Sequence, residues 1–258
     1  MVYPNSPFDT PNADLDTPRT ASAPNTNGRE AMAYMDAFSS FFKLEGWGKS
    51  LAFLALCSLI PIVGVIVMIG FFATQFVRQH YNGDEDLMEF SFDKFGDFLG
   101  RGVWPFLMGF IITFAMIPIY ALYFGAIAIS ANISETMAAI VAAGGGLLFI
   151  VVLFGLGFLS QPMFLKAMLT QQIGGAFDFN LAKDFVSKMW LEMLLGGLFI
   201  MGISIPLIML GYLACGIGLY AAIPLQYWTV FQIQRQLYEV YLFRGGTPIE
   251  ISEQLVPE

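Results

Sequence analysis

Long runs of apolar residues without a charged side chain are the feature that most restricts how this chain can fold. Residues 103–129 and 147–165 are two such runs. A helix needs roughly 20 residues to cross about 30 Å of hydrocarbon, and both runs reach that length or come close to it. The whole chain is 57% hydrophobic and 12% charged, with a mean hydropathy of +0.66, outside the range of soluble globular proteins. The sequence therefore predicts an all-helical, multi-pass membrane protein.

The two ends of the chain differ from this apolar middle. Residues 1–28 contain five prolines among Asn, Thr, Ser and Asp, a composition that buries too little surface to fold. They also lack the basic start and apolar run of a secretory signal. We expect a disordered tail over residues 1–28, a helical membrane domain over 29–246 and a second tail over 247–258.

A pattern of aromatic, charged and proline residues recurs along the membrane domain. In its two clearest copies a Phe-x-Phe motif is followed by Asp-Phe, a basic residue and a tryptophan. These copies are Phe90-Ser91-Phe92 with Asp97-Phe98, Arg101 and Trp104, and Phe177-Asp178-Phe179 with Asp184-Phe185, Lys188 and Trp190. Ile-Pro pairs follow at residues 117–118 and 205–206, and a fainter copy runs from Trp47 to the pair at 60–61. We interpret the unit as an amphipathic entry, a helix out, a proline-marked turn and a helix back, over residues 36–83, 90–175 and 177–246.

The segments that precede the later tryptophans have the pattern of helices lying at the membrane surface. Apolar residues recur at three- and four-residue spacing with charged residues between them, so short interfacial helices are expected over 90–101 and 180–188. Tryptophan is favoured at the depth where a chain enters lipid. The expected interfacial anchors are Trp47, Trp104, Trp190, Phe92, Phe95, Phe98 and Phe185.

The distribution of basic residues predicts the orientation. The loops near residues 64, 130–136 and 211 contain no Lys or Arg, whereas the entry side contains many. The positive-inside rule then places both termini in the cytoplasm, with the protein in the cell inner membrane. About six transmembrane helices are expected, as three tandem hairpins, near residues 47–60, 64–79, 103–130, 141–170, 188–210 and 213–236.

The first hairpin fits a bilayer least well. Residues 47–78 would be about 48 Å long as one helix and about 24 Å as each of two halves, against about 30 Å of hydrocarbon. Charge favours a hairpin, which could be re-entrant. The alternative is a single helix here, and hence five spans in all.

Several of these motifs together resemble a known family. They are Gly46-Trp47-Gly48-Lys49, the Ile-Pro-Ile-Val-Gly turn at residues 60–64, and the Phe-x-Phe and Asp-Phe motifs. Over about residues 38–245 the chain is similar to the uncharacterised membrane family called domain of unknown function 4013. It departs from that family's Leu-Pro-Glu-Trp linker, having Leu87-Met88-Glu89-Phe90 instead. The resemblance implies a multi-pass membrane protein and supplies no catalytic residue.

Residues that could perform chemistry are few. His80 is the only histidine, and the acidic run that follows it lacks the spaced oxygen ligands of a calcium loop, so a solvated connector is expected. The sequence contains no nucleophile–base set and no phosphate-binding glycine motif. Cys57 and Cys215 lie in apolar blocks and are expected to act as small hydrophobes. We expect no catalytic, cofactor-binding or metal-binding residue, no cofactor, and no binding of nucleic acid.

Three glutamines in the apolar spans leave two functions open. Gln161 precedes Pro162, Gln226 lies two residues after Pro224, and Gln75 lies in the first return helix. They could line a polar pathway, or they could hydrogen-bond between helices as packing. Transport sites more often contain ionisable residues at depth, so we favour packing. A structural or accessory membrane protein is therefore the preferred function, with a small-solute transporter or channel as the alternative. The expected partners are the lipid bilayer and other membrane proteins or a second copy of the chain.

Overall fold

The computed structural model describes residues 29–252, apart from 82, 84, 85, 87, 89 and 215, together with residue 255. Over these residues the regular structure is entirely helical, as predicted. The elements are α1 (Tyr34–Lys43), α2 (Trp47–Ser58), α3 (Val63–Tyr81), the 3-10 helix η1 (Phe92–Lys94), α4 (Phe95–Ala131), α5 (Glu135–Thr170), the 3-10 helix η2 (Gly174–Ala176), α6 (Phe179–Leu213) and α7 (Ile217–Phe243). The tail expected at 1–28 lies outside the described residues.

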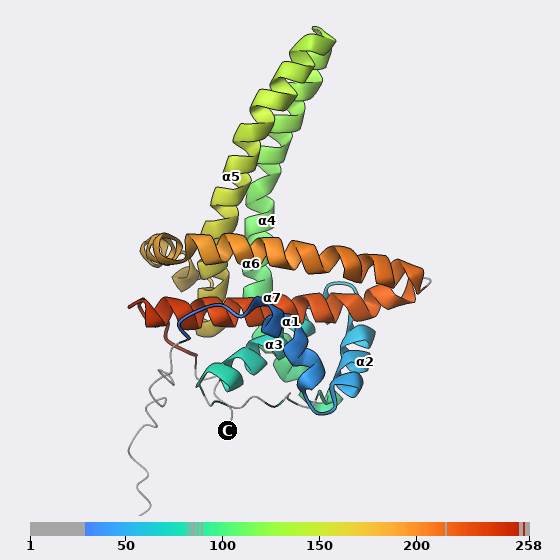
Figure 1. Cartoon of the computed structure of the whole chain (residues 1–258), viewed down its shortest axis with the longest axis vertical. Helices are drawn as coiled ribbons and strands as arrows, with labels where there is room; N and C mark the ends of the chain where they lie inside the picture. Colours follow the sequence, from blue (N-terminus) through green and yellow to red (C-terminus); the bar gives the residue numbers. More distant parts are fainter. Residues whose placement is uncertain are drawn as a thin grey trace, which may run out of the picture.

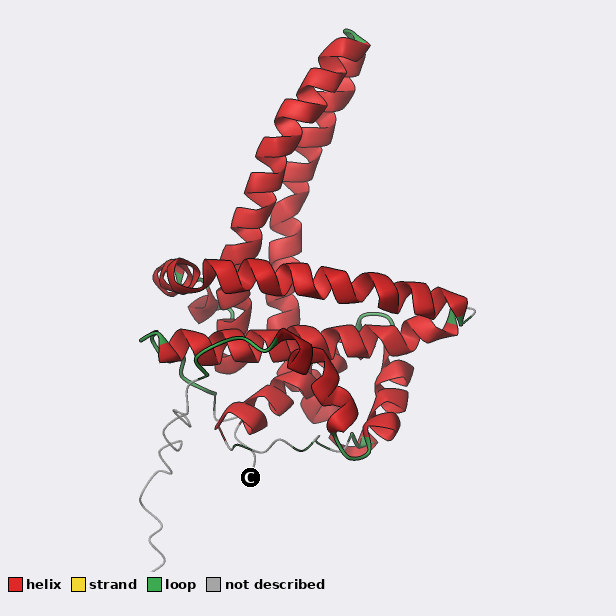
Figure 2. Cartoon of the chain, viewed as in Figure 1, coloured by secondary structure: helices red, strands yellow, loops and turns green. Residues whose placement is uncertain are grey.

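Successive long helices pair as hairpins, α2 with α3, α4 with α5 and α6 with α7. The α4–α5 hairpin projects as a long rod from a body that the other helices build, and the α6–α7 hairpin lies across the base of this rod (Figure 1). Short turns join the helices within each hairpin (Figure 2). The α4–α5 turn is closed by Ser134, whose side chain accepts a hydrogen bond from the backbone N–H of Met137 and so caps α5.

Four helices in the described chain are long and apolar enough to cross a membrane: α3, α4 with η1, α5 and α6. The chain is therefore a multi-pass membrane protein by length and composition. Side chains such as Leu122 and Leu147, 75% and 71% exposed, leave the surface of the rod to be covered by lipid. By contrast, most of α3 is buried inside the protein. The 12 residues of α2 extend only about 18 Å, too short to cross about 30 Å of hydrocarbon.

Two of the three prolines expected to mark turns lie inside helices. Pro61 does lie at the α2–α3 turn, where Ile62 adopts a left-handed backbone with φ of 65°. Pro118 and Pro206 instead lie within α4 and α6, which continue to Ala131 and Leu213. Internal prolines are tolerated in membrane helices because neighbouring helices, Ser and Thr side chains and local adjustments of the helix satisfy the backbone groups that a proline frees.

The predicted interfacial helices are not separate elements. The segment 90–101 passes through η1 directly into α4, and 180–188 is the beginning of α6. Since extending a helix costs little once a turn has formed, α4 continues past Arg101 through Gly102 and Pro105, and α6 continues past Lys188. The separate short amphipathic helix is α1, which packs on α7.

The buried core lies where α1, α3 and α7 meet the N-terminal parts of α4 and α6 and the C-terminal part of α5. It is rich in aromatic rings, with Trp228 of α7 packed edge-on against Phe41 of α1 at 5.4 Å and against Phe72 of α3 at 6.1 Å between ring centroids. Such pairs contribute about 0.5–1.5 kcal/mol each beyond the area they bury. This core fixes the base from which the α4–α5 rod projects.

Candidate functional site

The three glutamines singled out in the sequence lie on three different helices and do not meet. Gln75 of α3 is 1% exposed and clamps the following loop: its Nε2 donates to the carbonyl of Asp86 at 2.8 Å, and its Oε1 accepts from the N–H of Met88 at 2.9 Å. Gln226 of α7 donates to the hydroxyl of Ser204 in α6 at 2.9 Å. The Oε1 atom of Gln161, in α5, is buried and has no hydrogen-bond donor among the described residues. Two of the three therefore have packing partners.

The tryptophans proposed as anchors are on the surface. Trp47, Trp104 and Trp190 are 39%, 36% and 54% exposed. They lie toward the N-terminal ends of α2, α4 and α6. Trp228, which the repeat did not single out, is buried, and its indole N–H donates to the hydroxyl of Ser40 at 3.1 Å. It joins α7 to α1 and has no interfacial role.

The phenylalanines expected to anchor beside them divide into two kinds. Phe92 is 59% exposed and Phe95 is half-buried, so both reach the surface. Phe98 is buried against Phe71, with ring centroids 5.5 Å apart, and Phe185 is buried at 4.6 Å from Tyr241. These last two side chains contact protein and not lipid, because α4 and α6 turn this face toward the core.

A cluster of charged residues joins the beginning of the described chain to the ends of α3 and α7. Glu239 of α7 lies 3.4 Å from the Nε of Arg29, 3.3 Å from the Nη1 of Arg235 and 3.6 Å from the Nδ1 of His80. The side chain of Glu239 is 16% exposed and that of His80 only 3%. We call Glu239 with Arg29, His80 and Arg235 the Glu239 cluster. Only the Arg235–Glu239 pair, at i,i+4 spacing, could have been seen in the sequence.

Amides continue this network through the core. Gln232 donates to Gln79 of α3 at 2.7 Å and accepts from Arg235 at 3.1 Å. Gln236 both donates to the carbonyl of Ala33 and accepts from its N–H, at 3.2 and 2.8 Å. These amides of α7 thus hold α3 by one hydrogen bond and the segment before α1 by two.

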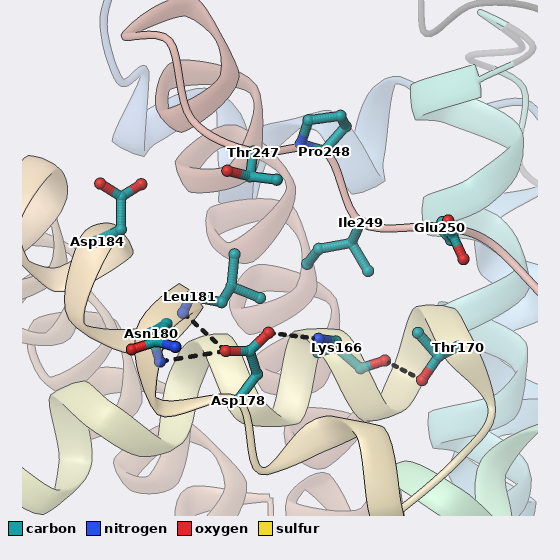
Figure 3. Close-up of a pocket in the computed structure, with 10 residues that line it drawn as sticks. All are labelled: Lys166, Thr170, Asp178, Asn180, Leu181, Asp184, Thr247, Pro248, Ile249 and Glu250. Carbon is teal, nitrogen blue, oxygen red and sulfur yellow. Dashed lines mark hydrogen bonds and ion pairs between the residues drawn. The ribbon is translucent and has the colours of Figure 1, made fainter.

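A polar cleft of about 660 Å³ lies where α5 ends and α6 begins (Figure 3). On one wall, the Nζ of Lys166 lies 2.7 Å from the Oδ2 of Asp178. The other oxygen of Asp178 accepts from the backbone N–H groups of Asn180 and Leu181 and so caps α6. The hydrogen bond from Leu181, and then that from Lys166, lower the pKa of Asp178 below its ordinary value.

The segment 247–250 forms the opposite wall of the cleft (Figure 3). The hydroxyl of Tyr241 accepts from the N–H of Thr247 at 3.0 Å and donates to Asp184 at 2.7 Å. The hydroxyl of Tyr238 accepts from the N–H of Ile249 at 2.8 Å. The C-terminal segment expected to be a free tail is therefore packed on the body through residue 252, whose N–H donates to the carbonyl of Leu169.

Two aspartates that line the cleft both have bonded partners. Asp178 is bonded to Lys166, and Asp184 to both Lys188 and Tyr241. The described residues that line it include neither a histidine nor a cysteine, and the described chain holds no group of three or more metal-ligating side chains. The cleft is therefore best described as a structural contact between the α5–α6 connection and the C-terminal segment.

Comparison with known protein families tests the family resemblance that the sequence motifs indicate. The model of the family described as "Protein of unknown function (DUF4013)" matches residues 53–217, more than half of the chain. The chain belongs to the DUF4013 family. Neither the curated proteins nor the solved structures gave a match.

The DUF4013 match includes some helices of the molecule and leaves others outside. It covers the second half of α2, all of α3 to α6 and the first residue of α7, a shorter range than the 38–245 expected. Lys166 and Asp178 of the cleft lie inside it, whereas Glu239 and the segment 247–250 lie outside. In this DUF4013 protein, the cleft and the Glu239 cluster thus join the matched helices to segments beyond the match.

Proposed function

We propose that this DUF4013 protein is a structural or accessory protein of the inner membrane that presents a tightly joined polar face to partner proteins or to a second copy of itself. One observation supports this most: the three intramembrane glutamines occupy separate sites, and two of them serve packing. The polar residues at the base of the hairpins are bonded to one another in the Glu239 cluster and the cleft. Polar residues bonded in this way can hold partner proteins in fixed positions. Such a scaffold function requires no catalytic group or cofactor.

In the proposed topology, the α4–α5 rod crosses the bilayer and both termini lie in the cytoplasm, while the α6–α7 hairpin lies across the base of the rod (Figure 1). The charges support this orientation, since Lys43, Arg101 and Lys188 belong to the base while the α4–α5 turn has no Lys or Arg. The shortness of α2 favours a re-entrant first hairpin. Among the three hairpin connections, only the α4–α5 turn has an acidic residue beside it, Glu135 at the start of α5, as suits a turn that emerges into water on the far side.

Reporter fusions test this topology. An alkaline phosphatase fused after residue 258 or after residue 28 is expected to be inactive, and a fluorescent protein at either position is expected to be bright, because both positions are cytoplasmic. A phosphatase inserted in the α4–α5 turn at residue 133 is expected to be active. An active phosphatase at residue 28 with an inactive one at 258 would instead establish the five-span alternative.

Cysteine labelling separates a scaffold from a transporter. With Cys57 and Cys215 replaced by serine, Gln161→Cys and Gln226→Cys are expected to stay unlabelled by small aqueous thiol reagents, because thiolate chemistry requires water. Glu45→Cys, on the exposed α1–α2 turn, is the positive control, and Leu122→Cys is the lipid-facing negative control. Rapid labelling at both glutamine positions, with Leu122→Cys inert, would overturn the scaffold proposal in favour of transport.

The alternative, a small-solute transporter or channel, has one observation in its favour. The buried Oε1 of Gln161 lacks a donor among the described residues and lies beside Pro162. A polar pathway would need further polar groups at that depth, and Gln226 is already bonded to Ser204. The scaffold therefore remains the function that the geometry supports best.

A further inference from the structure

The α6–α7 hairpin forms a layer of two helices across the base of the rod (Figure 1). α6 packs on α7, and α7 in turn contacts α1, α2 and α3 of the body. In Figure 1, α6 lies nearer the far end of the rod and α7 lies nearer the body. The side of α6 opposite α7, which we call its outer face, therefore points in the direction in which the rod projects.

The part of the rod that projects beyond this layer is about as long as the hydrocarbon of a bilayer is thick. Burial in α4 ends at Met108, apart from Ser130 in the last turn, and burial in α5 begins at Pro162. Ala182 of α6 belongs to the same buried cluster as Met108. Residues 109–131 extend about 34 Å as a helix, against about 30 Å of hydrocarbon. When the rod crosses the bilayer, the layer of α6 and α7 therefore lies at the edge of the hydrocarbon.

The two sides of α6 have different surroundings. One side is buried against α7, where a Cβ atom added at Gly196 would lie 3.1 Å from the side chain of Ile233. The outer face carries exposed apolar residues at seven- and four-residue spacing, which places them on one side of the helix: Leu191, Leu198, Ile205 and Met209. Leu198 shares an apolar notch with Phe154 of α5. The outer face is therefore continuous with the surface of the rod that lipid covers.

The turn between α6 and α7 is apolar as well. Between Glu192 and Arg235 the sequence contains no charged residue. Leu213 and Ile217, on either side of the turn, are 79% and 75% exposed. The N–H groups of Gly216 and Ile217 both donate to backbone carbonyls, so the turn satisfies these groups itself, as lipid requires. Unlike the α4–α5 turn, which has an acidic residue beside it, this turn suits a lipid environment and not the water beyond the far surface.

We propose that the α6–α7 hairpin lies lengthwise in the cytoplasmic leaflet, with the outer face of α6 bound to the acyl chains of that leaflet. This inference rests on the proposed topology, in which the rod crosses the bilayer and its base is cytoplasmic. Glu192 and Arg244, which pair at the open end of the hairpin, then lie among the lipid headgroups. Although α6 is long enough to cross the membrane, it instead holds the base parallel to the membrane surface, as an interfacial helix does.

Spin labels on single cysteines of the full chain, with both native cysteines replaced by serine, test this proposal in liposomes of phosphatidylcholine and phosphatidylglycerol. The depth of each label follows from its relative accessibility to oxygen and to a water-soluble nickel chelate. Labels at Leu191→Cys, Leu198→Cys and Met209→Cys are expected to lie within about 5 Å of one another in depth, one helical turn, because the outer face is parallel to the membrane. A label at Leu198→Cys about 10 Å deeper than one at Leu191→Cys would mean that α6 crosses the membrane, and would overturn the proposal.

The rod supplies a matched control at the same spacing. Phe110 and Ile117 are exposed positions of α4, and a label at Ile117→Cys is expected to lie about 10 Å deeper than one at Phe110→Cys because α4 crosses the membrane. Equal depth at these two positions would reject the crossing rod, and hence the proposed topology together with this inference. A depth difference in both helices would reject the in-plane hairpin alone. Exclusion of oxygen and the nickel chelate alike from the α6 labels would mean that protein, such as a second copy, covers the outer face, and would also overturn the proposal.

Discussion

Replacing Gly102 with alanine is expected to cost about 3 kcal/mol or more of folding free energy, at or above the usual cost of overpacking. An alanine Cβ at this position would lie 1.8 Å from the carbonyl oxygen of Ile66 in α3. The contact is reciprocal, because a Cβ at Gly70 of α3 would lie 1.8 Å from the carbonyl oxygen of Phe98 in α4. Both obstacles are backbone atoms, so the helices would have to move apart and open the core that fixes the rod.

The matched control is Gly100→Ala, two residues away on the same helix. A Cβ there meets nothing within 4 Å, so alanine is expected to stabilise the protein by up to about 1 kcal/mol through its higher helix propensity. Unfolding in mild detergent by added denaturing detergent, followed by tryptophan fluorescence, measures both. If the two variants proved equally stable, the close α3–α4 crossing would be refuted.

The apolar blocks predicted the helices well, because a helix of sufficient length is the only open segment that satisfies its backbone in lipid. The sequence pattern does not show whether lipid or protein covers a given face of a helix, because both environments select the same apolar residues. Phe98 and Phe185 were therefore expected at the interface, although both are core residues. The α3–α4 glycine crossing was equally invisible, because small residues have many roles in helices.

The candidate sites depended on contacts between segments far apart in sequence. His80 was expected beside a solvated acidic run, of which Asp84 and Glu85 lie outside the described residues. In the fold it lies instead beside Glu239, 159 positions later. Spacing alone carries no information about such a pairing. The glutamines could be listed from sequence, but only the fold shows that Gln226 has a partner in Ser204 and that Gln161 has none among the described residues.

The second large effect is expected from Glu239→Gln. This change removes a carboxylate that Arg29, Arg235 and His80 all approach, while leaving the shape of the side chain nearly unchanged. Removing one member of a largely buried ion pair leaves the other charge uncompensated and costs about 3–5 kcal/mol, and we expect about 3 because Glu239 is partly exposed. The control is Asp36→Asn, since the Asp36–Lys43 pair is exposed on both sides and such pairs contribute about 0–1 kcal/mol.

The pH dependence of stability gives this prediction a second, independent readout. Burial raises the pKa of Glu239, but the hydrogen bond from His80 and the charges of Arg235, His80 and Arg29 outweigh it and bring the pKa below its ordinary value. The folded state thus binds fewer protons than the unfolded state, so this stabilisation is complete above the unfolded pKa of about 4.3 and is lost as the pH falls through the folded value. The difference in unfolding free energy between wild type and Glu239→Gln should shrink as the pH falls below about 4. A difference that stayed constant down to pH 3 would mean that the cost of the substitution comes from packing, and that the charge of Glu239 does not hold the cluster together.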